Sequence, residues 1–182
     1  IQDQTSPNLA HIPTTNLLTY SEDFSVSAGW GATGAVVTSN QAISPDGTLN
    51  ATLVELDTNA DRLAVVLSST GGTYTFSFYV KAKEGESGNW LSRVVGDSSL
   101  LATTFVDDSA WVRVSQKFTK TGSGNIIPYP AYRLNGTSTL FNAYIWGAQI
   151  EEQSQATAYL KSDGIASVRK ATTTNLVLYS ED

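Results

Sequence analysis

The chain has 182 residues, of which 41% are hydrophobic and 15% are charged, and its formal net charge is −6. This length suits one domain with a sizeable core. The acidic balance, without any Lys/Arg cluster, argues against a phosphate-binding footprint, so we expect no nucleic-acid partner and no membrane partner. Cysteine is absent, which excludes disulfides and thiolate metal sites.

Short alternating segments separated by turn residues follow one another along the chain. Residues 1–13, which contain two prolines, are expected to form an extended lead-in. None of the later segments has a helical period, so the pattern predicts an all-β fold, an antiparallel two-sheet jelly-roll sandwich over residues 14–160. The predicted strands are residues 16–20, 35–38, 52–56, 63–67, 72–83, 90–95, 101–106, 111–118, 126–134, 142–151 and 157–160.

Two of these strands have the clearest faces. Strand 72–83 alternates, and its apolar residues at 74, 76, 78 and 80 predict one buried face. Strand 142–151 places Tyr144, Trp146, Ala148 and Ile150 on one face by the same rule, so Tyr144 and Trp146 are expected in the core.

A ten-residue segment occurs twice. TTNLLTYSED at 14–23 recurs as TTNLVLYSED at 173–182, with eight of ten positions identical at an offset of 159 residues. One interpretation is modular: residues 161–182 are a linker plus the first strand of a second repeat. The alternative is an assembly strand that adds to the sheet edge of a neighbouring subunit. Its residues would be Asn175, Leu176, Val177, Leu178 and Tyr179.

Six sequence segments in the span 16–160 are distinctive. They are NLLTYSEDF at 16–24, SPDGT at 44–48, YTFSFYVK at 74–81, WVR at 111–113, YIWGAQIE at 144–151 and ATAYL at 156–160. In this order they resemble a jelly-roll module of bacteriophage virion proteins (tail fibres, tailspikes or decoration proteins), which is itself similar to carbohydrate-binding modules. The resemblance implies a jelly-roll fold, a virion or extracellular setting, contacts with other virion subunits, and no catalytic residues.

Exposed aromatic rings are the candidate ligand-binding residues, because sugar rings stack on Trp and Tyr faces. Trp30 and Trp111 are expected to be packing anchors. The residues expected opposite core faces or beside loops, and therefore on a sugar platform, are Tyr79, Trp90, Tyr129 and Tyr132.

Carboxylates offer a weaker hypothesis of a structural Ca²⁺. If the first and last strands are neighbours, oxygens of Glu22, Asp23 and Glu151 converge, and Ca²⁺ needs six to eight such ligands. The resemblance supplies the analogy, since related carbohydrate modules hold a structural Ca²⁺. His11, the only histidine, lies in the lead-in, and adjacent carboxylates on a strand point to opposite faces, so no enzyme is expected.

The residues therefore leave two functions open. The first is a structural or adhesive module of a phage virion protein, which presents surface for subunit contact, including self-association, or for host contact. The alternative is a carbohydrate-binding module that recognises a host surface glycan.

Overall fold

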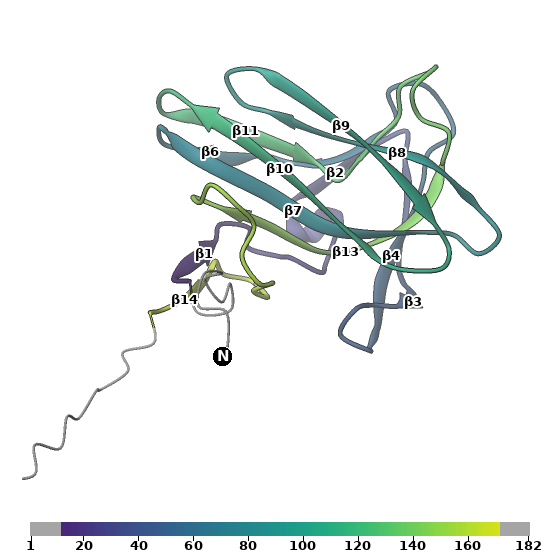
Figure 1. Cartoon of the computed structure of the whole chain (residues 1–182), viewed down its shortest axis with the longest axis horizontal. Helices are drawn as coiled ribbons and strands as arrows, with labels where there is room; N and C mark the ends of the chain where they lie inside the picture. The colour runs from purple at the N-terminus through teal and green to yellow at the C-terminus, as the bar shows by residue number, and fades with distance from the viewer. Residues whose placement is uncertain (1–11, 172–182) are drawn as a thin grey trace, which may run out of the picture.

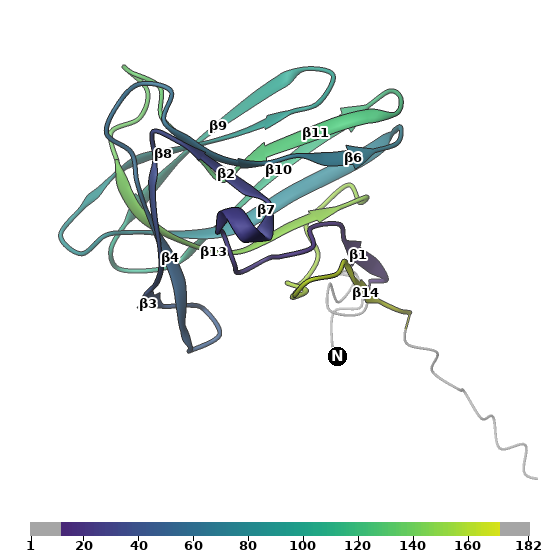
Figure 2. The same cartoon turned by 180° about the vertical axis from the view of Figure 1, so that it is seen from behind.

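The computed structural model describes residues 12–171, which form two packed β-layers (Figures 1 and 2). The first layer is a five-stranded antiparallel sheet in the order β10–β7–β13–β4–β3. Its strands are β10 (Val112–Lys120), β7 (Gly72–Ala82), β13 (Asn142–Glu151), β4 (Leu49–Glu55) and β3 (Val36–Ile43).

The second layer combines a four-stranded sheet, β6–β11–β8–β9, with a three-stranded sheet, β12–β5–β2. The two sheets continue one another, because only Val66 separates β5 from β6 and only Pro130 separates β11 from β12. A short 3-10 turn, η2 (Val26–Ala28), precedes β2. The strands are β2 (Trp30–Thr33), β5 (Arg62–Val65), β6 (Leu67–Ser69), β8 (Ser87–Val95), β9 (Ser99–Asp107), β11 (Gly124–Tyr129) and β12 (Ala131–Tyr132). The predicted all-β sandwich is confirmed.

The core lies between the two layers. From β7 it takes the alternating side chains that the sequence predicted to be buried, Tyr74, Phe76, Phe78 and Val80. The second layer contributes Trp30, whose ring packs against that of Phe24 at a centroid distance of 4.9 Å, together with Trp90, Val94 and Val106.

The predicted single face of strand 142–151 is wrong, because a β-bulge interrupts β13. Its pairing with β7 shifts register between Trp146 and Gln149, and Gly147 has a φ of +64°. One extra residue reverses which side chains face the core. Ala148 and Ile150 are therefore core residues, whereas Tyr144 and Trp146 are on the outer face, level with Lys81 and Tyr79 of β7.

The fold continues past Leu160, where the sequence analysis placed its end. β1 (Thr14–Asn16) pairs antiparallel with β14 (Ser167–Arg169), so that Thr14 lies opposite Arg169. Residues 157–160, expected as a strand, form none; side-chain contacts hold this segment instead. His11 and the second copy of the repeat at 173–182 lie outside the described residues.

Within residues 12–171 no helix has the length and apolar character needed to cross a membrane.

Candidate functional site

An aromatic row crosses the outer face of the five-stranded sheet. Arg113 of β10 lies opposite Tyr79 of β7, and Tyr79 lies opposite Trp146 of β13. The guanidinium carbon of Arg113 is 5.4 Å from the centre of the Tyr79 ring, and the Tyr79 and Trp146 ring centres are 5.5 Å apart. Tyr159 covers the other side of Trp146 at 4.4 Å, so Trp146 is only 3% exposed.

The sheet curls over this face until its two edges meet. The indole nitrogen of Trp111, directly before β10, donates a hydrogen bond to the carbonyl oxygen of Ile43 at the end of β3, at 3.2 Å. β10 and β3 are opposite edges of the sheet, and the second layer fills the inner face, so the contact passes over the outer face. We call the concave outer face that Trp111 bridges the trough.

The trough holds a cavity of about 400 Å³, and its lining comes from strands that a flat sheet would keep apart. Ala42 of β3 and Lys81 of β7 both line it, although β4 and β13 lie between these strands. Tyr144, Glu84 and Asp108 complete the lining. Among the described residues, the side chains of Lys81, Glu84 and Tyr144 have no hydrogen-bond or ion-pair partner, so they are available to a ligand.

Tyr159 fixes the floor of the trough. Its hydroxyl is 2.7 Å from the Ser21 hydroxyl and donates to Glu22 Oε1 at 2.9 Å. Burial of the ring raises the pKa of Tyr159 well above its usual value, so the phenol stays protonated and keeps donating. The ring that packs on Trp146 is therefore anchored from the N-terminal segment.

The predicted sugar platform divides into three places. Tyr79 lies in the trough. Trp90 is a correction: it is 1% exposed and its indole nitrogen donates to the Pro130 carbonyl oxygen at 2.7 Å, because β8 turns this ring into the core. Tyr129 and Tyr132 lie together on the outer face of the second layer, with ring centres 5.9 Å apart.

Sequence reasoning missed Tyr144, Trp146 and Trp111 as trough residues. The signal for the first two was Gly147, since a glycine inside a strand pattern marks a bulge. The contact of Trp111 with Ile43 spans 68 residues of sequence, and no local pattern indicates it.

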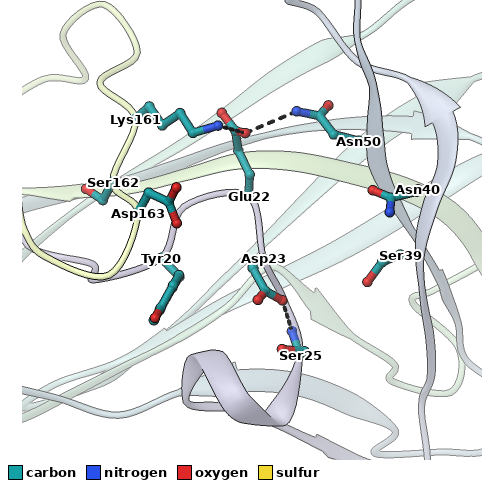
Figure 3. A pocket seen from close by; sticks show the side chains of 10 residues that line it. All are labelled: Tyr20, Glu22, Asp23, Ser25, Ser39, Asn40, Asn50, Lys161, Ser162 and Asp163. Atoms are coloured by element: carbon teal, nitrogen blue, oxygen red, sulfur yellow. Dashed lines mark hydrogen bonds and ion pairs between the residues drawn. The ribbon is translucent and has the colours of Figure 1, made fainter.

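The first two carboxylates of the calcium hypothesis line a separate pocket near the N-terminal segment (Figure 3). Glu22 Oε2 accepts hydrogen bonds from Lys161 Nζ at 2.7 Å and from Asn50 Nδ2 at 3.0 Å. The hydrogen bond to Glu22 raises the pKa of Lys161. Asp23 accepts from the Ser25 backbone N–H at 2.9 Å. The Lys161 ammonium group therefore already neutralises Glu22, and it occupies the place where a cation bound to this carboxylate would lie.

Glu151, the third residue of that hypothesis, is fully buried elsewhere. Its Oε1 accepts from the Thr14 hydroxyl at 2.8 Å, and its Oε2 accepts from the Thr157 N–H at 3.0 Å. The structure therefore does not bring the three carboxylates together. No group of three or more His, Cys, Asp or Glu residues within 12–171 is arranged to hold a metal ion.

The sequence matches no protein-family model and no curated protein. The fold, however, is similar to that of solved carbohydrate-binding modules. The CBM22-1 xylan-binding domain of Paenibacillus barcinonensis Xyn10C matches with a TM-score of 0.53 at 16% identity, over 79% of this chain and 94% of that domain.

Two further modules give the same result. A xylan-binding domain of CBM 22 has a TM-score of 0.53 at 19% identity, over 74% of this chain and 94% of that one. TmCBM61, solved with β-1,4-galactotriose, has a TM-score of 0.53 at 13% identity, over 76% and 99%. At these identities the comparisons show a shared jelly-roll fold.

Proposed function

We propose that the chain is a carbohydrate-binding module and that its glycan lies in the trough. The observation that carries the proposal is the trough itself, where aromatic rings lie beside a cavity lined by Lys81, Glu84 and Tyr144, whose polar ends are unpaired within residues 12–171. Binding sites commonly combine an apolar floor with a few convergent polar groups. A sugar presents the complementary surface, with an apolar ring face and polar hydroxyls.

The similar solved modules support this choice of ligand class, since two are named as xylan-binding and one was solved with a galactotriose. These modules match this chain over more than nine-tenths of their own length. We therefore infer a binding role rather than a catalytic one, and a glycan displayed outside the cell as the partner.

Glycan-array screening of the chain, followed by titration calorimetry with xylan and galactan oligosaccharides, tests the proposal. Tyr144→Ala should weaken binding by roughly 2- to 12-fold, because a stacking contact contributes on the order of 0.5–1.5 kcal/mol. Tyr144→Phe should keep most of the affinity that depends on the ring. Phe105→Ala is the matched control for these neutral oligosaccharides, since Phe105 is an exposed aromatic residue (64%) on β9 of the second layer, away from the trough. No binding of any glycan at millimolar concentration would contradict the proposal.

A second candidate is the structural module of a phage virion protein. The repeated ten-residue segment and the sequence segments within 16–160 that resemble phage virion modules support it. Under this proposal the partners are other subunits, and residues 175–179 act as the assembly strand. Light scattering on the chain with and without residues 172–182 tests the strand, and an unchanged oligomeric state would rule it out.

A further inference from the structure

A second surface lies on the other side of the sandwich from the trough. There the guanidinium of Arg93 on β8 lies over two rings, 5.5 Å from the centre of Tyr129 and 5.1 Å from that of Tyr132. The two rings meet edge to face. Tyr129, Arg93 and Leu101 are opposite one another on β11, β8 and β9, and so form one row across the sheet. We call Arg93, Tyr129, Tyr132 and Leu101 the arginine face.

The geometry of Arg93 leaves its outer edge free. Its Nε donates to the Ser99 hydroxyl at 2.8 Å, and its guanidinium carbon lies over both tyrosine rings. Among the described residues nothing pairs with its two Nη atoms. A guanidinium held at Nε and stacked on rings loses little freedom when it binds, and its free edge matches a carboxylate in a two-point contact.

The local charge is opposite in sign to that of the whole chain. The strands of the second layer contain three charged residues, Arg62, Arg93 and Asp107. Arg62 lies opposite Tyr132. Asp107 is six residues along β9 from Leu101, about 20 Å at the rise of a strand. The nearby Asp97 is paired with Lys120 at 2.9 Å. In a chain of net charge −6, this face therefore favours anions.

Exposed apolar side chains of β9 lie beside Arg93. Leu101 is 49% exposed in the same row, and Phe105 is 64% exposed two positions further along the same face of β9. A ligand for this face would therefore have a flat apolar side and a carboxylate within reach of it. The sugar ring of a uronic acid has both.

We propose that the arginine face is a second binding surface, which takes an acidic polysaccharide by pairing a uronate carboxylate with Arg93 while the sugar ring packs on the tyrosines and Leu101. The surface is separate from the trough and does not depend on it.

Affinity electrophoresis of the full chain in gels containing polygalacturonate tests the proposal, with fully methyl-esterified polygalacturonate as the probe that keeps the sugars and removes the charge. We expect retardation by the acid form only. Arg93→Gln should weaken it roughly 10- to 100-fold, as expected for a lost charge-assisted pair. Arg93→Lys should recover part of the loss, and added salt should weaken binding further.

Tyr144→Ala separates this proposal from the trough proposal. It should leave the binding of polygalacturonate intact and weaken the binding of neutral glycans. Arg93→Gln should weaken the binding of polygalacturonate and leave the binding of neutral glycans intact. Equal binding of the acid and ester forms, retention of acid binding by a folded Arg93→Gln variant, or loss of acid binding in Tyr144→Ala would each overturn the arginine face. Thermal melts of every variant confirm folding. Loss of neutral-glycan binding alone would contradict only the trough.

Discussion

Asn16 should be one of the most important single side chains for stability, because both of its ends bond to backbone from distant parts of the chain. It is fully buried. Its Nδ2 donates to the carbonyl oxygens of Ala148 at 3.2 Å and Leu160 at 3.0 Å. Its Oδ1 accepts from the N–H groups of Leu18 at 3.2 Å and Ile150 at 3.1 Å. The residue thereby joins the N-terminal segment to β13 and to the segment after it.

Asn16→Ala leaves these four backbone groups without their partner. At about 0.5–1.5 kcal/mol for each lost bond, the free energy of unfolding should fall by about 2–6 kcal/mol. In a chain of this size each kcal/mol lowers the melting temperature by about 2–4 °C. For a loss near the middle of that range, about 4 kcal/mol, the expected decrease is about 8–16 °C.

Urea unfolding and calorimetry measure both quantities. Asn16→Asp is the matched variant, because it preserves shape but points an oxygen at two carbonyl oxygens. At neutral pH it should be at least as unstable as Asn16→Ala, and it should recover as the pH falls, since protonating the introduced carboxylate restores one donor. A loss below about 1 kcal/mol in both variants, or no pH dependence in the second, would refute this reasoning.

Three other results are expected. Gly147→Ala should lower the free energy of unfolding by about 1–2 kcal/mol, since φ is +64° and a Cβ would lie 3.3 Å from two tyrosine rings; an unchanged melting temperature would contradict this. The double variant Leu18→Val, Thr19→Leu converts the first copy of the repeat into the second. Its free energy of unfolding should fall by only about 1 kcal/mol, because position 18 is buried and loses one methylene while position 19 is exposed. A decrease above about 3 kcal/mol would contradict the idea that the two copies can form the same structure. Hydrogen bonds from Thr121 and Lys120 lower the pKa of Asp97 from 3.8 to about 2. Its stabilising effect is therefore present above pH 3.8 and lost as the pH falls through 2, so Asp97→Asn should destabilise more at pH 5 than at pH 2 in urea unfolding; equal effects would contradict the shift.

The sequence predicted those parts of the fold in which local alternation and burial coincide. In β7, Tyr74 and Phe76 point inward at every second position, as period two requires. The predicted strands 90–95 and 101–106 are present as the paired strands β8 and β9, with Arg93 opposite Leu101. These features depend on neighbours close in the chain.

The candidate site was less predictable because it depends on departures from regular geometry. The bulge at Gly147 reverses the faces of β13, so Tyr144 leaves the core for the trough. Alternation alone cannot decide which layer covers a strand, and Trp90 was therefore expected outside although β8 buries it. The bridge from Trp111 to Ile43 needs the curl of the whole sheet.

The pairing of β1 with β14 has a practical consequence for protein engineering. Thr14 and Arg169 are directly opposite each other, and both views show the two strands side by side at one end of the molecule (Figures 1 and 2). A domain whose first and last strands are adjacent can be inserted into a surface loop of a host protein. Residues 12–171 should therefore tolerate transplantation into such a loop, with both junctions at a single point on the host surface.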